Sequence, residues 1–174
     1  MRVARTAAFL LLGFGSAGNS LAQSPATVTV RELQPLIGHW QGSLTYLDYS
    51  SGKPYTMPAD INIQQIGRSN RFRRAYSYPK EASANSVDTL TVSADGRLLD
   101  QEPIKTKRRL PGGNLEIVTE TAGTDGNDNQ PALIRHTYVI GRDVYTSRKD
   151  VQFAGQTTWL KRHEYSYTRS ATGR

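Results

Sequence analysis

Polar aromatic and basic side chains recur at every second position in segments 71–78 and 159–167 of this 174-residue chain. Successive side chains of a β-strand point to opposite faces, so this alternation places hydroxyl, imidazole and guanidinium groups on one face. Trp40 and Trp159 fall on this same face of their segments, so both are expected to point into the interior. We therefore predict a ligand-binding face. Its predicted members are Tyr46, Phe72, Arg74, Tyr76, Tyr78, Tyr138, Lys161, His163 and Tyr165.

This set carries more polar groups than a filled apolar core requires, and each buried polar group needs a partner. It suits an amphiphilic ligand whose acidic end is anchored by Arg74 or Lys161, with tyrosines along the ligand's body. The alternative is that the tyrosines bond to each other or to water near an open rim. Periodicity alone does not decide which face points inward.

The same residues offer little for catalysis. His163 and Glu164 are adjacent, so in a strand they point to opposite faces and do not form an acid–base pair. The chain has no cysteine and no Gly-x-Ser-x-Gly motif. His136 and His163 could meet across a lumen and hold a metal with Asp48, but no local spacing requires it. No catalytic residue and no metal site are predicted.

Basic residues outnumber acidic ones, 22 to 15, which gives a formal net charge of +7. They concentrate in segments 68–74 and 105–109. Charges that alternate along strands mark a solvated face, and no aromatic residues are interleaved with the second segment to stack on bases. Nucleic acid is therefore not a predicted partner. The positive charge instead predicts weak contact with an anionic surface of the cell envelope.

Alternating segments separated by turn residues fill most of the chain after residue 36, and none shows helical periodicity. Residues 122–131 are expected to be the longest connection without regular structure. Pro103 is expected at an edge or bulge, because proline lacks a backbone donor. The predicted strands cover residues 38–49, 55–66, 71–78, 86–93, 97–109, 115–121, 132–140, 144–153 and 157–168.

About eight to ten antiparallel strands joined by short turns predict an all-β, up-and-down barrel, since closure removes the two exposed edges of a long meander. An interior of that size is filled by side chains or holds one small ligand. Thr29 and Glu32 have the spacing of a capping box, which predicts a short helical turn before the first strand. Residues 23–174 are expected to form one domain, of about 150 residues.

Residues 1–22 have the pattern of a signal peptide. Arg2 and Arg5 precede an apolar run at 7–12, and Ala22 ends a stretch of small residues at the usual cleavage spacing. The run is shorter than the roughly 20 residues that span a bilayer. We therefore expect a periplasmic or secreted protein whose mature chain has no transmembrane segment.

The order Leu-x-x-Leu-x-Gly-x-Trp-x-Gly, spanning Leu33 to Gly42 after a helical turn, resembles the opening of the lipocalin and wider calycin barrels. The resemblance implies that Trp40 closes one end of the barrel beneath a basic residue from the last strand. Arg162 or Arg169 is the matching residue. The chain lacks the disulfide cysteines and the middle motif of typical lipocalins. It therefore resembles small bacterial barrels more closely than it resembles typical lipocalins.

The chain also resembles nitrobindin-like haem barrels, which open with a Gly-x-Trp-x-Gly motif and ligate iron through a histidine from a late strand. By that resemblance His163 is an axial-ligand candidate. Three functions follow as expectations: an exported lipocalin-like protein that binds a small apolar or amphiphilic molecule without a cofactor, a haem protein, or a ligand-free structural or interaction module of the envelope.

Overall fold

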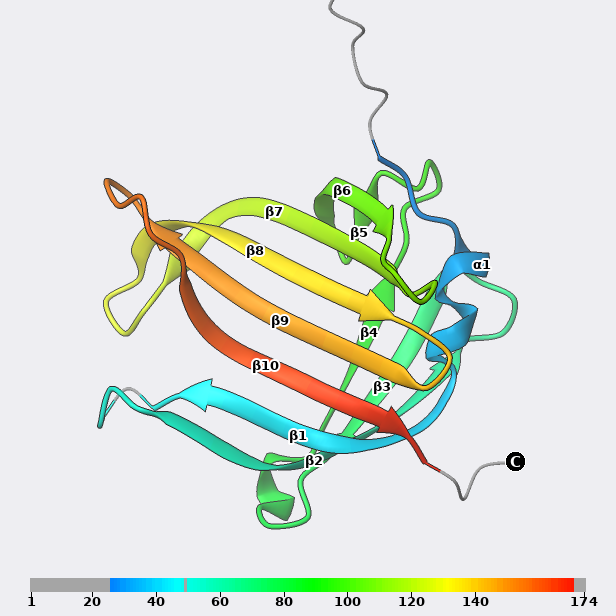
Figure 1. Ribbon diagram of the computed structural model, residues 1–174, viewed down its shortest axis with the longest axis horizontal. Coiled ribbons are helices and arrows are strands. Elements are labelled where there is room, and N and C mark those ends of the chain that lie inside the picture. Colours follow the sequence, from blue (N-terminus) through cyan, green and yellow to red (C-terminus); the bar gives the residue numbers. More distant parts are fainter. Residues whose placement is uncertain (1–25, 49, 171–174) are drawn as a thin grey trace, which may run out of the picture.

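The computed structural model describes residues 26–48 and 50–170; the predicted signal peptide lies outside this part of the chain. The fold is all-β, as predicted, with a short helix before the first strand (Figure 1). The elements are α1 (Val30–Leu33), η1 (Gln34–Leu36), β1 (Gly38–Leu47), β2 (Pro54–Gln65), β3 (Arg71–Ser77), η2 (Ala82–Ala84), β4 (Ser86–Thr91), β5 (Leu98–Leu99), β6 (Glu102–Arg109), β7 (Leu115–Asp125), β8 (Gln130–Ile140), β9 (Val144–Phe153) and β10 (Leu160–Arg169).

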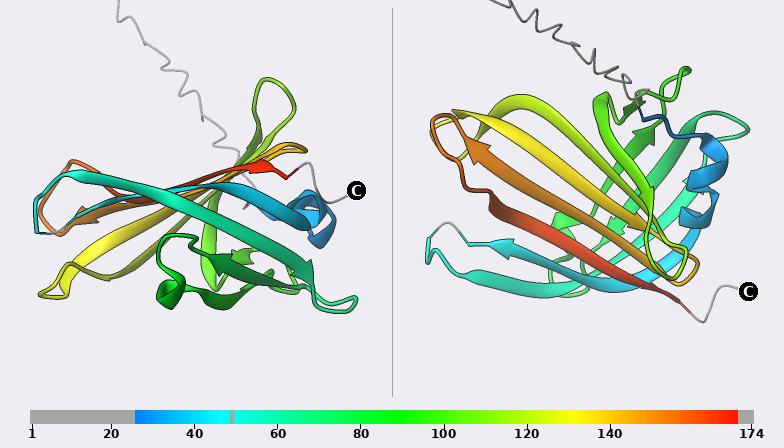
Figure 2. Two further views of the ribbon diagram at one scale, coloured as in Figure 1. Left: turned by 90° about the horizontal axis from the view of Figure 1, so that it is seen from below. Right: turned by 45° about the horizontal axis from the view of Figure 1, so that its top comes forward.

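The strands form one antiparallel sheet in the order β4-β3-β2-β1-β10-β9-β8-β7-β6-β5. Chain neighbours pair with each other except β4 and β5, and the pairing of β1 with β10 joins the first strand to the last. The sheet curls into a nearly closed barrel (Figure 2). None of the described helices is both long and apolar enough to cross a membrane.

The two free edges of the sheet, β4 and the β5–β6 hairpin, meet along a line that we call the seam. They are joined at one end only, by a bridge between Val92 and Leu99. The Asp100 amide donates to the Thr91 carbonyl at 2.7 Å beside that bridge. The barrel wall is therefore continuous everywhere except along the rest of the seam.

The helical turn covers one end of the barrel, which we call the base. Thr29 and Glu32 form the predicted capping box. This fixes the turn so that Leu33 and Leu36 point into the barrel, where both are fully buried. Trp40 is also buried, and its indole Nε1 donates to the Leu36 carbonyl at 2.7 Å. The indole thus buries a large apolar area with its one polar atom satisfied.

Of the two arginines considered, Arg169 lies over Trp40, with its guanidinium carbon 4.1 Å from the ring centroid. Arg169 also donates to the backbone carbonyls of Pro35, Ile37 and Arg142. A cation over an indole face contributes about 0.5–2 kcal/mol. Arg162 lies elsewhere in the barrel, in an ion pair with Asp125.

The prediction of an irregular connection at 122–131 is wrong. β7 continues to Asp125 and β8 begins at Gln130, so only a four-residue turn separates them. Gly126 and Asn129 supply the positive φ angles of that turn. The polar residues of 122–131 therefore extend two paired strands, because the ladder satisfies their backbone whatever their side chains are.

Candidate functional site

A cavity of about 280 Å³ lies inside the barrel, away from the base. This volume is just below the roughly 300–1,000 Å³ of typical ligand pockets. Ser86 and Asp88 of β4 are exposed, so the cavity opens to solvent at the seam. Its lining residues are Arg74, Tyr76, Tyr78, Ser86, Asp88, Asp100, Glu102, His136, Tyr138, Ser147, His163 and Tyr165.

Arg74 of β3 reaches across the seam and is itself buried. Its guanidinium donates twice to Asp88, from Nε at 2.5 Å and from Nη2 at 3.0 Å, and Nη2 also donates to Asp100 at 3.2 Å. A bidentate carboxylate pair is a strong, directional contact. Arg74 therefore ties the two edges of the seam together through their carboxylates.

Asp100 is held in place by a tight turn between β5 and β6. Leu99 pairs with Glu102, and the two turn residues Asp100 and Gln101 have φ angles of 54° and 68°. Such two-residue turns favour Asn or Asp at the first position and Gly at the second, so Asp100 suits its positive φ, whereas Gln101 stores about 1–3 kcal/mol of strain. Burial raises the pKa of Asp100; Arg74 opposes this shift, and nearby carboxylates add to it. The turn keeps an acidic group in an unfavourable electrostatic setting beside the cavity.

Glu102, at the start of β6, and His136 of β8 form a hydrogen-bonded pair across β7. His136 Nδ1 lies 2.8 Å from Glu102 Oε2, and the buried Thr119 hydroxyl donates to the same oxygen. Burial alone would raise the pKa of Glu102, but the hydrogen bonds from His136 and Thr119 lower it overall. Glu102 is therefore ionised, and it orients the His136 ring toward the cavity.

His163 lies on the cavity wall from β10. Burial, together with the nearby His136 and Lys149, lowers its pKa to about 4. Since the usual value is about 6.5, the imidazole is neutral at neutral pH. A neutral imidazole both donates and accepts a hydrogen bond.

Tyrosines form the floor and one side of the cavity. The hydroxyls of Tyr78 and Tyr165 are 2.8 Å apart, and the rings of Tyr76 and Tyr165 lie 5.5 Å apart between centroids. Tyr167 stacks on Tyr165 at 5.8 Å and is buried. Its hydroxyl has no hydrogen-bond partner in the part of the chain that the structure describes.

The structure brings six of the nine predicted ligand-binding residues to this cavity: Arg74, Tyr76, Tyr78, Tyr138, His163 and Tyr165. Two others lie inside the barrel without lining it. Phe72 is fully buried in the core at the base. Tyr46 is partly buried and packs on Tyr55 with ring centroids 5.6 Å apart.

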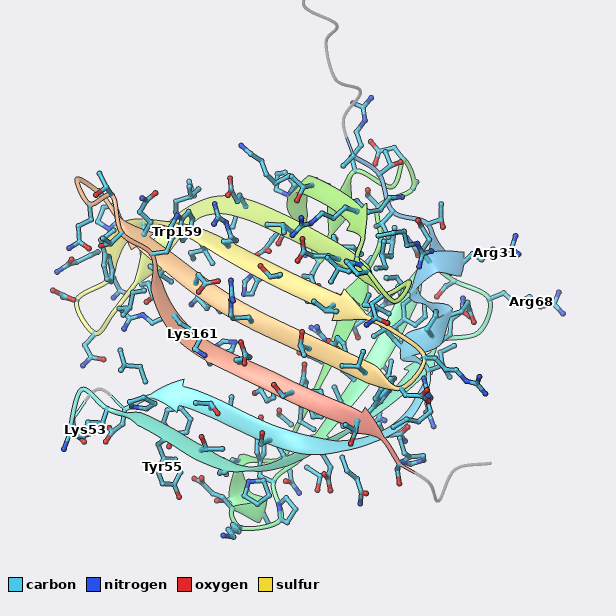
Figure 3. The ribbon with its side chains drawn as sticks, viewed as in Figure 1. Arg31, Lys53, Tyr55, Arg68, Trp159 and Lys161 are labelled. Atoms are coloured by element: carbon cyan, nitrogen blue, oxygen red, sulfur yellow. The ribbon has the colours of Figure 1, made fainter. Side chains whose placement is uncertain are left out.

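Lys161 does not face the lumen. The register of β10 against β9 shifts between Lys161 and His163, so Arg162 is an extra residue in a β-bulge. This bulge breaks the alternation: Lys161 pairs with Asp150, its side chain is half exposed (Figure 3), and its ammonium lies 3.8 Å from Glu164. The predicted ligand anchor Lys161 therefore lies on the outer face.

Trp159 also lies outside the lumen, just before the start of β10 (Figure 3). The guanidinium of Arg135 covers its ring at 3.8 Å, and Arg135 is on the outer face because its neighbour His136 points inward. The prediction that Trp159 points inward is therefore wrong. The bulge residue Arg162 again explains this, because one extra residue reverses the face of every position before it.

Three acidic lining residues were missed, namely Asp88, Asp100 and Glu102. A signal existed for Asp88, which shares its strand face with the buried Leu90 and Val92. An acidic residue on an otherwise apolar face points inward. No comparable pattern precedes Asp100, because its position depends on the tight turn.

No group of three or more His, Asp or Glu side chains in the described residues is arranged to hold a metal ion. For haem, the neutral imidazole of His163 suits an axial ligand, but the walls do not suit the macrocycle. The volume of the cavity is below the usual pocket range and its seam side carries ion pairs, whereas a porphyrin is a large, mostly apolar ligand.

A barrel with such a cavity is a fold compatible with ligand binding. No family model and no curated protein matches the chain. Among solved structures, Rv2717c from M. tuberculosis is similar with 14% identity and a TM-score of 0.48, over 83% of this chain and 99% of that one. A protein of unknown function from the DUF3598 family of Nostoc punctiforme has 16% identity and a TM-score of 0.40, over 88% of this chain and 53% of that one. Both TM-scores are below 0.5, so these similarities say nothing about the function of this chain.

Proposed function

We propose that this chain is an exported, lipocalin-like binding protein that holds one small amphiphilic molecule in the cavity beside the seam. The observation that carries the proposal is the composition of the cavity wall. Tyr76, Tyr78, Tyr138 and Tyr165 present apolar rings and hydroxyls to a space that the protein's own side chains leave open. This mixture of aromatic area and a few polar groups is typical of small-molecule sites.

The contrast with the base supports this assignment. At the base the interior is filled, and the Trp40 nitrogen has a backbone partner. At the cavity, in contrast, tyrosine hydroxyls and the rings of His136 and His163 line a space that stays open. Polar groups that are removed from water need partners, so such a lining favours an occupant that supplies them.

The proposal is tested by filling the cavity. Ser147 lines it from β9, so Ser147→Phe should occupy the space with a ring. The matched control is Ser166→Phe, on the exposed outer face of β10. The probe is 2-naphthol, a neutral amphiphile followed by its own fluorescence. We expect at least tenfold weaker binding in Ser147→Phe and no change in Ser166→Phe.

Native mass spectrometry of the full chain complements this titration, since a molecule retained from the host cell should be present in the wild type and absent from Ser147→Phe. Equal 2-naphthol binding in both variants would place the probe outside the lumen. No binding by the wild type, with no retained molecule, would instead favour the ligand-free structural module.

Haem coordination by His163 is the alternative raised by the resemblance to haem barrels, and the size and ion pairs of the cavity speak against it. If His163 ligates haem, titration should give a shifted Soret band that His163→Ala removes. A spectrum that is the same in both proteins excludes axial ligation by His163.

A further inference from the structure

The charges around the cavity do not balance. Three carboxylates line it, Asp88, Asp100 and Glu102, against one guanidinium, that of Arg74. His163 is neutral at neutral pH. Even a doubly protonated His136 would offset only one more carboxylate. The lining therefore carries at least one negative charge in excess.

The excess is concentrated at the seam. Arg74 is shared between Asp88 and Asp100, and the Asp100 contact is the single, longer one. The side chain of Asp88 is 49% exposed and that of Asp100 is 35% exposed, so each has oxygen surface left for another donor. Both carboxylates stand where the cavity opens.

The wall opposite the seam carries positive rather than negative charge. Lys149 and Arg162 lie near His163 but both pair with Asp125, so that group adds one positive charge on the far side. Between the two sides stand the rings of Tyr76, Tyr78 and Tyr165. Aromatic faces attract cations when these are partly removed from water.

An acidic ligand end has no suitable anchor at the seam. Arg74 is the one guanidinium on the lining, and it is already engaged by two carboxylates. Lys161 lies outside the lumen. An anion at the seam would have to displace one carboxylate and lie beside the other, and like charges at such distances repel strongly.

We propose that the cavity selects a small cationic amphiphile, an aromatic or apolar amine whose ammonium group binds at the Asp88–Asp100 pair and whose body lies against the tyrosines. This inference rests on the proposed binding function and names the ligand class of the same cavity. It replaces the acidic ligand expected from the sequence. The ammonium group donates hydrogen bonds to the exposed sides of the Asp88 and Asp100 carboxylates, and the tyrosine hydroxyls and His163 supply the remaining polar contacts.

Three probes with the same ring and different head groups test the charge preference: 2-phenylethylamine, 2-phenylethanol and 3-phenylpropanoate. Calorimetric titration of the full chain at pH 7 and low salt should rank them amine, alcohol, acid. A hydrogen bond to an ionised partner is worth enough for about a tenfold preference for the amine over the alcohol. That preference should shrink as salt rises.

The decisive variant is Asp100→Asn, which removes the charge and keeps the shape. Asparagine readily adopts the positive φ found here, so the turn should be retained. We expect a loss of about fivefold to tenfold in amine affinity with unchanged alcohol affinity. Asp143→Asn, at an exposed position of the β8–β9 turn, changes the net charge equally and should leave both affinities unchanged.

Tighter binding of 3-phenylpropanoate than of the amine would overturn the inference and identify Arg74 as the anchor. Equal binding of all three probes, abolished by Ser147→Phe, would also overturn it while leaving the proposed binding function intact. Absence of binding by every probe, 2-naphthol included, would remove the binding function and this inference with it.

Discussion

The two halves of the barrel interior differ in packing: one is filled by apolar side chains and the other encloses an open, charged space. At the base, Leu33, Leu36 and Trp40 fill the space, and the Trp40 nitrogen is paired with a backbone carbonyl. Around the cavity, Arg74 and its carboxylates line a space that stays open. Apolar burial stabilises the base, whereas the cavity half retains charges whose burial costs free energy. The filled base therefore stabilises the barrel more than the cavity half does.

Trp40→Ala should have the largest effect on stability. Truncating a fully buried tryptophan leaves a void and removes its contact with Arg169, at a cost of about 3–5 kcal/mol in the free energy of unfolding. Urea unfolding followed by circular dichroism measures this loss. Trp159→Ala, on the outer face, is the control and should cost much less. Similar losses in the two variants would contradict the assignment of the base as the stabilising half.

Acid should weaken the cavity half through His163. Its folded pKa of about 4 is below the unfolded value of about 6.5, so the unfolded chain binds this proton first as pH falls. The contribution of His163 to the free energy of unfolding should therefore drop between pH 6.5 and pH 4, by about 2–3 kcal/mol. Comparison of wild type with His163→Gln at pH 7 and pH 4.5 isolates this loss.

The exposed His39 offers the matched control for that comparison. His39→Gln should retain the wild-type pH dependence, whereas His163→Gln should flatten it. An NMR titration that places the imidazole pKa of His163 near 6.5 would contradict the desolvated environment described here.

Arg74→Gln should destabilise the protein by about 2 kcal/mol at pH 7, because it leaves Asp88 and Asp100 facing each other without a cation. Burial raises the pKa of Asp100, so its protonation in acid relieves that repulsion, and the loss measured by urea unfolding should be smaller at pH 4 than at pH 7. A loss that is independent of pH would show that Arg74 acts by packing alone.

Tyr78→Phe should have the smallest effect. It removes one hydroxyl of the Tyr78–Tyr165 pair and leaves the other with space to reach water, so we expect a loss of about 1 kcal/mol in thermal or urea unfolding. Phe72→Leu in the filled core is a useful companion, and it should cost about as much or more through lost packing.

Much of this architecture could be predicted from the sequence because strand alternation is a local property. The strands, the helical turn and the burial of Trp40 all follow from short patterns, and so does the inward position of Arg74, Tyr76 and Tyr78. The bulge at Arg162 could not be predicted this way. One extra residue reverses the alternation before it, which misplaced Lys161 and Trp159.

The acidic side of the cavity was missed for a different reason. Asp100 belongs to a two-residue turn and Glu102 to the first position of β6, so their directions depend on backbone angles and on strands far away in the sequence. The inward direction of Asp88 could be predicted, because it alternates with the buried Leu90 and Val92. The ligand charge inferred from sequence therefore rested on the cations alone.

The pairing of β1 with β10 brings together the two most distant parts of the described chain, and Arg169 donates to the Ile37 carbonyl across a separation of 132 residues. Contacts of such long range form late and slowly in folding, since a large loop must close before they form. Until β10 has been synthesised, Trp40 has no guanidinium over it and β1 has one unpaired edge. The barrel therefore cannot be completed during synthesis before β10 is available to pair with β1.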